Sequence, residues 1–246
     1  MIILKDKIFI HIPKTSGTNF RKNILTEYLS DEYSNYALEI DENKFSILGN
    51  KKINEIIKIM SQDSDNITLK SGEKLITINT LNICPYLIKH FPLNFWEKCS
   101  IYKNQSVFTI VRNPYTRFIS HYEHTIKCLK LFFNFEKPTL NQFINSKNIN
   151  FIASKFECAY YQLNQVDYLT DLSKNIVCDK FYKMETDQEK ISKDFNLPNL
   201  NKTKINQRNY NKDYSTLYDD EVIAWVQKTY KRDFEYFSYD INPFWK

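Results

Sequence analysis

The sequence predicts an α/β fold, a three-layer domain with a central parallel β-sheet flanked by helices. Short apolar strands alternate with helical patterns, and two of these strands lead straight into a helix through a short polar segment. The chain has 246 residues, of which 42% are hydrophobic and 15% aromatic. That is enough for one substantial core, so we expect a single domain over residues 1–246.

The first strand–helix junction lies near the N-terminus. Residues 7–12 are β-branched and aromatic, which predicts a buried strand ended by Pro13. From Thr18 onward, apolar residues recur at helical spacing. Residues 30–73 are polar and rich in Asn and Lys, and we expect a loop-rich excursion from the core with one amphipathic stretch at residues 53–60.

The second junction follows an unbroken apolar run at residues 106–111, which is typical of a central parallel strand. Asn113 is the expected cap of the next helix and Pro114 its first residue. Other expected elements are a short strand at 86–89, a helix from Thr139, a strand at 176–184 and a C-terminal helix at about 219–231. The tail aromatics Trp225, Phe234 and Trp245 are expected in the core.

Composition narrows the classes of function. The net charge of +5 and the pI near 8.7 suit an anionic ligand but are too weak to predict a nucleic-acid partner. No signal peptide and no apolar stretch of about 20 residues is evident, so we expect a cytoplasmic protein without a transmembrane segment. Five scattered cysteines without a CxxC pair indicate reduced thiols and no zinc site.

The loop in "IFIHIPKTSGTNF" has the features of a phosphate cradle. Ligands of open α/β sheets bind beyond the carboxyl ends of strands, and the first turn of a helix presents unpaired N–H groups to anions. Lys14 adds a charge, Thr15, Ser16 and Thr18 add hydroxyls, and Gly17 allows close backbone approach. The loop lacks the GxxxxGK[ST] order of a Walker motif. An ordinary turn with a chance lysine is the alternative.

A second anion site is predicted at "FTIVRNPYTRFISHY". Arg112 stands at the strand exit, where a guanidinium can grip a phosphate with two hydrogen bonds. Arg117 and Ser120 lie on the following helix, and Ser120 leans back toward its start. Two anion sites at neighbouring strand exits suit a nucleotide with phosphates on both sides of its ribose.

These two motifs resemble those of the sulfotransferases that use 3′-phosphoadenosine 5′-phosphosulfate (PAPS), especially the carbohydrate O-sulfotransferase branch, including heparan uronyl 2-O-sulfotransferases. The first is similar to that family's PKTGGT loop, with Ser16 in place of the commoner glycine. "NIVCDKFYKMETDQEKI" and the C-terminal tail are also similar to family segments. The resemblance implies a P-loop-like sulfotransferase fold, with residues of about 30–80 and 125–160 as variable, acceptor-side segments.

The resemblance also implies site residues and substrates. PAPS would be the co-substrate, without a metal, and a saccharide or glycoconjugate hydroxyl the acceptor. PAPS would be bound by Lys14, Thr15, Ser16, Gly17, Thr18 and Asn19 on its 5′ side and by Arg112 and Ser120 at its 3′-phosphate. Lys51, Lys52, Lys127 and Lys130 could favour an anionic glycan, or could simply face solvent.

Sulfuryl transfer parallels phosphoryl transfer in depending on positioning and charge stabilisation. Lys14 is expected at the bridging oxygen of the leaving group, and His90 is expected to be the general base. "IKHFPLNF" resembles the family's GHxxF-like segment, with Lys89 in place of glycine. Glu123 is an alternative base, while His11 is read as structural and His121 and His124 as non-catalytic.

Two other functions remain open from the sequence. A P-loop nucleotide kinase has the same architecture, although the missing GK[ST] disfavours it. A catalytically silent module that binds nucleotide or sulfated glycan is the third hypothesis. Binding of adenosine 3′,5′-bisphosphate, as against ATP with Mg²⁺, separates the sulfotransferase from the kinase.

Overall fold

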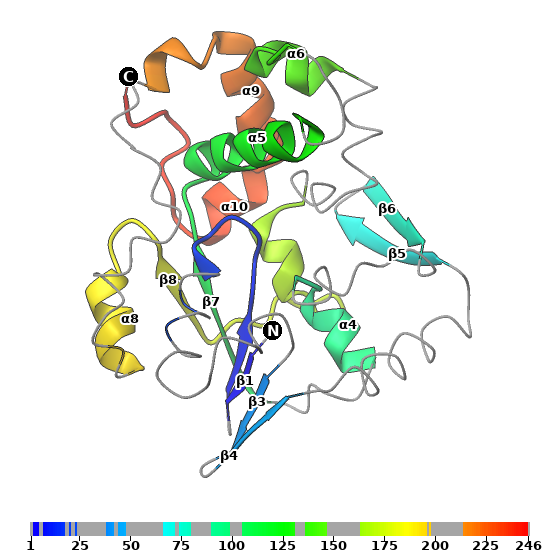
Figure 1. Cartoon of the computed structure of the whole chain (residues 1–246), viewed down its shortest axis with the longest axis vertical. Coiled ribbons are helices and arrows are strands. Elements are labelled where there is room, and N and C mark those ends of the chain that lie inside the picture. The colour runs from blue at the N-terminus through cyan, green and yellow to red at the C-terminus, as the bar shows by residue number, and fades with distance from the viewer. Residues whose placement is uncertain are drawn as a thin grey trace. The chain divides into compact units, whose positions relative to one another are not determined.

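The computed structural model describes residues 2–4, 7–17, 20, 23, 38–41, 44–47, 66–71, 74–79, 90–98, 105–130, 136–146, 163–195, 197 and 214–245. The chain divides into two compact units (Figure 1). Unit 1 comprises residues 1–111 and 165–203, and unit 2 comprises residues 112–164 and 204–246. The expectation of a single domain remains a prediction.

Unit 1 carries the β-sheet. Its strands are β1 (Ile2–Leu4), β2 (Lys7–Ile10), β3 (Leu38–Asp41), β4 (Lys44–Ile47), β5 (Asn66–Ser71), β6 (Lys74–Asn79), β7 (Ser106–Val111) and β8 (Lys180–Lys183). Its helices are α4 (Leu93–Lys98), the 3₁₀-helix η4 (Gln165–Leu169) and α8 (Gln188–Asp194). The main sheet has the order β4-β3-β1-β2-β7-β8, and β5 and β6 form a separate hairpin.

The predicted α/β fold is confirmed by the parallel strands β2, β7 and β8. Ile10 pairs with Thr109, and Val111 pairs with Lys183, so the carboxyl ends of the three strands meet at one edge of the sheet. The sheet as a whole is mixed, because β1 runs antiparallel to β2 and β4 antiparallel to β3. The expected parallel sheet is the β2-β7-β8 part, and β1, β3 and β4 extend it on the β2 side.

Strand β7 is the middle strand of the parallel trio, between β2 and β8, and its apolar run is typical of such an interior strand. Five of its residues are buried, so both of its faces are covered. On one face Phe108 and Ile110 pack with Phe20 from the segment after β2 and with Ile191 from α8, within a larger aromatic cluster. Burying a side chain of this size contributes about 1.5–3 kcal/mol, so this cluster holds the sheet to its covering helices.

The polar segment 30–73 contains more regular structure than expected. Strands β3 and β4 join the main sheet, and β5 pairs with β6. The sequence signal was the alternation of apolar and acidic residues in "LEID", which is typical of a half-buried strand but is too short to stand out from a polar background. The predicted stretches at 53–60 and 86–89 lie outside the described residues.

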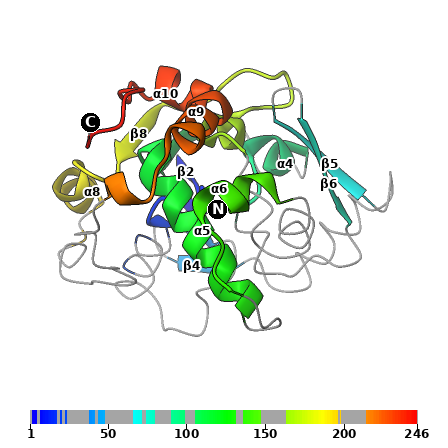
Figure 2. The ribbon, with the colours of Figure 1, turned by 90° about the horizontal axis from the view of Figure 1, so that it is seen from above.

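Unit 2 consists of helices in the part that the structure describes. These are α5 (Pro114–Lys130), α6 (Leu140–Asn145), the 3₁₀-helix η5 (Tyr214–Thr216), α9 (Asp220–Thr229) and α10 (Lys231–Tyr236). Helices α5 and α6 both contact α9 (Figure 2). Thr139 begins α6 with a complete capping box, and Asp219 caps α9 through its side chain.

The expected C-terminal helix is confirmed, but it divides into α9 and α10 at Tyr230. The expected strand at 176–184 is shorter, since only Lys180–Lys183 pairs as β8. Phe234 is buried in the unit 2 core, and Trp225 and Trp245 pack against that core, as predicted. Within the described ranges, no helix has both the length and the apolar character needed to cross a bilayer.

Candidate functional site at the carboxyl edge of the sheet

The segment after β2 turns sharply before a helix begins. His11, Ile12 and Pro13 are buried, and residues 13–16 form a turn that becomes helical at Gly17. The carbonyl oxygen of Ser16 accepts a hydrogen bond from the Phe20 N–H at 3.2 Å, which closes the first helical turn. We call residues 13–17 the exit loop. It lies where the sequence predicts a phosphate cradle.

Two residues of the exit loop have left-handed backbone conformations. The φ angle is 67° at Lys14 and 70° at Ser16, a region that non-glycine residues seldom adopt. Backbone that alternates between left-handed and ordinary residues turns successive N–H groups toward one side, which suits an anion. The conformation also explains why glycine fits the position of Ser16 well.

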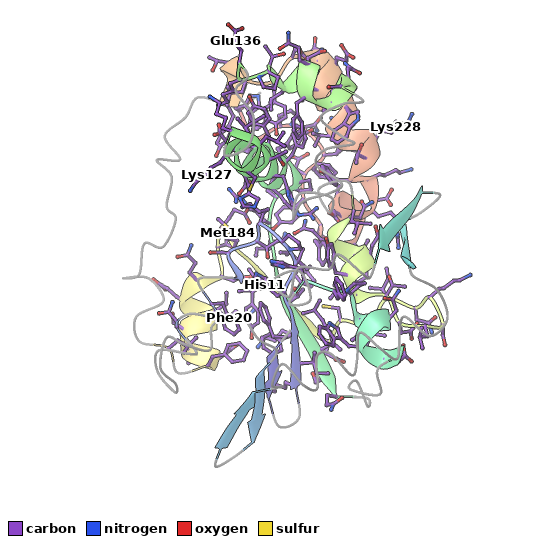
Figure 3. All side chains as sticks on the ribbon, turned by 45° about the vertical axis from the view of Figure 1, so that its right-hand side comes forward. His11, Phe20, Lys127, Glu136, Met184 and Lys228 are labelled. Carbon is purple, nitrogen blue, oxygen red and sulfur yellow. The ribbon has the colours of Figure 1, made fainter. Side chains whose placement is uncertain are left out.

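The remaining described residues of the exit loop hold its shape. Thr15 is fully buried, and its hydroxyl donates to the Ile12 carbonyl oxygen at 2.9 Å. A Cβ atom at Gly17 would lie 2.1 Å from Cδ2 and 2.4 Å from Nε2 of His11, so the His11 ring occupies the space of a side chain there. His11 lies in the interior of unit 1 (Figure 3). Thr18 and Asn19 lie outside the described residues.

His90 lies beside the start of this loop, although it is 79 residues away in the chain. Its Nδ1 is 3.0 Å from the backbone oxygen of His11, and the two imidazole centroids are 4.2 Å apart. A carbonyl oxygen only accepts hydrogen bonds, so Nδ1 is the protonated nitrogen and Nε2 carries the lone pair of the neutral ring. The half-buried His90 is thus held in the tautomer that a base at Nε2 requires.

The second predicted anion site begins directly after β7. Arg112 is 3% exposed, and its Nε donates to the Thr116 hydroxyl oxygen at 2.9 Å. Asn113 caps α5 as predicted, because its Oδ1 accepts from the Tyr115 N–H at 3.0 Å. Ser120 is half-buried on α5, one helical turn beyond Thr116 and on the same side of the helix. Sequence reasoning missed Thr116, although its spacing of four from Arg112 was a readable signal.

Arg117 is structural rather than a ligand group in this geometry. It is fully buried in unit 2, donates to the Leu163 carbonyl at 2.9 Å and lies 3.7 Å from an Asp233 carboxylate oxygen. A guanidinium so deep in the protein is stable only when its charge and donors are matched by such partners.

The alternative bases lie in unit 2. The Glu123 carboxylate pairs with the Lys137 ammonium at 2.9 Å. His121 is 1% exposed, and His124 lies with its Nε2 3.7 Å from the Cys128 thiol sulfur. Of the lysines considered for an anionic glycan, Lys127 and Lys130 are exposed, and the other two lie outside the described residues.

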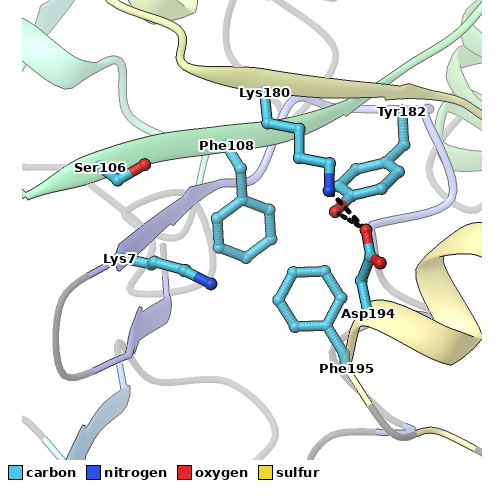
Figure 4. A pocket seen from close by; sticks show the side chains of 7 residues that line it. All are labelled: Lys7, Ser106, Phe108, Lys180, Tyr182, Asp194 and Phe195. Atoms are coloured by element: carbon cyan, nitrogen blue, oxygen red, sulfur yellow. Dashed lines mark hydrogen bonds and ion pairs between the residues drawn. The ribbon is translucent and has the colours of Figure 1, made fainter.

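The opposite, amino edge of the same strands contains a cavity of about 210 Å³ (Figure 4). It is lined by Lys7, Ser106, Phe108, Lys180, Tyr182, Asp194 and Phe195. The Asp194 carboxylate accepts from Lys180 at 2.5 Å and from the Tyr182 hydroxyl at 2.7 Å. The Lys180 hydrogen bond lowers the pKa of Asp194, and burial raises the pKa of Tyr182 to about 12. None of the residues predicted for the site lines this cavity.

Comparison with known proteins agrees with the motifs. A model described as the sulfotransferase family matches residues 5–240, a span that includes both strand exits and His90. No curated protein matches the chain, and no solved structure does. Among the described side chains, no group of three or more His, Cys, Asp or Glu residues is placed to hold a metal ion.

Proposed function

Because the chain belongs to the sulfotransferase family, we propose that it transfers the sulfuryl group of PAPS to a hydroxyl of a carbohydrate or glycoconjugate. Family membership supports sulfuryl transfer in general. The choice of donor and acceptor rests on the two motifs and on the geometry of the exit loop. The observation that carries the proposal is the placement of His90, the predicted base, against the start of the predicted donor loop.

The exit loop would bind the 5′-phosphosulfate of PAPS. The left-handed residues Lys14 and Ser16 favour an inward set of backbone N–H groups, and the start of the helix adds partial positive charge. The Thr15 hydroxyl already bonds within the loop, so Thr15 would contribute its backbone N–H. The Lys14 ammonium would offset charge that grows on the leaving oxygen. Gly17, Thr18 and Asn19 would complete this side of the site.

Arg112 and Ser120 would bind the 3′-phosphate. The Arg112–Thr116 bond uses one of the five N–H donors of the guanidinium and fixes its orientation. A guanidinium held in this way is suited to paired hydrogen bonds with phosphate oxygens. The parallel register of β2 and β7 supports the assignment, since both predicted anion sites follow carboxyl ends of neighbouring strands.

His90 would remove the proton from the acceptor hydroxyl during attack. The His11 carbonyl favours the Nδ1–H tautomer, which leaves Nε2 as the basic atom. An imidazole has its ordinary pKa near neutrality and therefore matches this task, whereas the Glu123 carboxylate is already engaged by the Lys137 ammonium. The saccharide character of the acceptor rests on the resemblance to the carbohydrate branch.

The test is transfer of radiolabelled sulfate from PAPS to a panel of glycans, together with thermal shift measurements. Adenosine 3′,5′-bisphosphate should raise the melting temperature, and ATP with Mg²⁺ should not. His90→Ala should keep the bisphosphate shift and lose turnover about 100-fold or more. A shift only with ATP and Mg²⁺ would contradict the proposal in favour of a kinase. A wild-type protein that binds the bisphosphate but transfers nothing to any glycan would indicate a silent binding module.

A further inference from the structure

His11 connects the two parts of the proposed site through both its ring and its backbone. It follows β2 directly and is 1% exposed. Its imidazole stacks on Phe9 at 5.9 Å, lies 4.2 Å from the His90 ring and fills the space beside Gly17. We propose that His11 is a positioning residue that sets both the distance of the exit loop from the end of β2 and the orientation of His90. This inference rests on the proposed function.

The contact with Gly17 determines how the exit loop folds back on the end of β2. The loop leaves β2 through His11 and returns at Gly17, where a Cβ would overlap Cδ2 and Nε2 of the same residue's ring. The loop therefore closes around the imidazole, and the imidazole acts as a spacer between the loop and the strand end. The ring sets how far the Gly17 backbone lies from the strand end, while the Thr15–Ile12 hydrogen bond closes the turn between them.

The contact with His90 has two separable components. The backbone oxygen of His11 accepts from Nδ1 of His90, and any residue at position 11 retains this acceptor. The ring contact, with planes inclined at 58°, depends on the side chain. A residue without the imidazole at position 11 should therefore keep the His90 tautomer, but the His90 ring would lose the contact that fixes its orientation. A base displaced by about 1 Å can lose roughly 100-fold in rate, so the orientation matters for turnover.

The first experiment, a size exchange, enlarges Gly17 to Ala in the wild type and in a variant whose His11 is reduced to Ala. The melting temperature and the affinity for adenosine 3′,5′-bisphosphate are measured for each protein. Gly17→Ala should lower both, because the new methyl group overlaps a ring that packing holds in place. In the His11→Ala background the same change should have much less effect on both readouts. Equal losses from Gly17→Ala in both backgrounds would overturn the spacer role.

The second experiment is a double-mutant cycle on kcat with PAPS and an accepted glycan. His11→Ala should lower kcat about 10- to 100-fold with little change in the acceptor KM. In the His90→Ala background it should cost less than about threefold, because the positioned group is absent. Effects that add fully would overturn the link to His90. If His11→Ala does not fold, His11→Asn keeps a smaller planar group and the same predictions.

A matched control separates positioning from general loss of stability. Val226→Ala removes a fully buried side chain of α9 in unit 2, whose core cluster contains neither histidine nor any residue of the exit loop. It should lower the melting temperature and leave kcat unchanged when measured well below that temperature. Absence of sulfuryl transfer by the wild-type protein would overturn the proposed function and the link to His90 together, whereas the size exchange would still decide the contact between His11 and the exit loop.

Discussion

The two edges of the parallel strands β2, β7 and β8 differ in how far their polar side chains are buried. At the carboxyl edge, Thr15 is fully buried and His11 is 1% exposed, and both are fixed by contacts within the exit loop. At the amino edge, Lys7 is exposed, and the Lys180–Asp194 pair is 46% and 30% exposed beside an open cavity. Strand β2, of only four residues, separates the two environments.

The two edges also differ in backbone strain, which is present in the exit loop. Left-handed backbone at two non-glycine residues costs about 1–2 kcal/mol each, and it occurs in the exit loop at Lys14 and Ser16. Among the described residues that line the amino-edge cavity, none has a positive φ. Strain that persists at one edge and not at the other indicates that the surrounding packing maintains it, as is common at binding sites.

The largest expected effect compares the two lysines at opposite ends of β2. Lys14→Ala should lower kcat of sulfuryl transfer about 100- to 1000-fold, because a charge that stabilises the leaving group is lost. Lys7→Ala, the matched control, should leave kcat and KM within about twofold, since an exposed charge at the far edge contributes little. Initial rates with labelled PAPS measure both. If both substitutions lowered kcat equally, the two edges would not differ in function.

Much of this architecture was predictable because its signals are local. The apolar run of β7, the Asn113 cap and the position of Pro114 each depend on a few adjacent residues. The strands β3 and β4 were not predicted, because β3 joins the sheet by pairing with β1, which is distant in the sequence, and β4 joins it only through β3. Register and strand order are tertiary properties that a short alternating pattern does not specify.

The candidate site was predictable in its residue types and not in its contacts. Lys14, Arg112 and His90 stand out because charge and strand exits are visible in the sequence. The overlap between Gly17 and the His11 ring was not visible, since the residues approach each other only after the chain reverses. The glycine was attributed to close approach by a phosphate, but a neighbouring ring also requires it.

The second effect concerns the carboxyl end of β7. Thr116→Val removes the hydroxyl that accepts from Arg112 Nε and keeps the side-chain shape. A hydrogen bond to a charged group contributes about 1.5–3 kcal/mol, so affinity for adenosine 3′,5′-bisphosphate should fall about tenfold or more. Calorimetric titration measures the change. Thr125→Val, at a buried position on the same helix, is the control and should leave this affinity unchanged.

The third effect tests the strain of the exit loop directly. Ser16→Gly relieves the left-handed conformation, and the free energy of unfolding should rise by up to about 1 kcal/mol after the greater chain entropy of glycine is included. Ser16→Val should lower it by more than about 1 kcal/mol, because a β-branched residue tolerates this φ poorly. Urea denaturation measures both. If both substitutions destabilise equally, the loop is not strained at Ser16.

The smallest effect lies at the amino edge and depends on pH. The Lys180 hydrogen bond lowers the pKa of Asp194 below its ordinary value of 3.8. A lowered folded-state pKa gives stability that is present above the unfolded pKa and lost as pH falls through the folded one. Because both partners are partly exposed, the contribution above pH 4 should be below about 1 kcal/mol.

Asp194→Asn should therefore lower the free energy of unfolding slightly at neutral pH and converge with the wild type as the pH falls below about 4. Urea denaturation at several pH values measures this convergence, and added salt should shrink the difference at neutral pH because the pair is accessible to screening. Turnover should not change, since Asp194 lies at the edge away from the exit loop. A loss of turnover at unchanged stability would place function at the amino edge and reverse the comparison between the two ends of the strands.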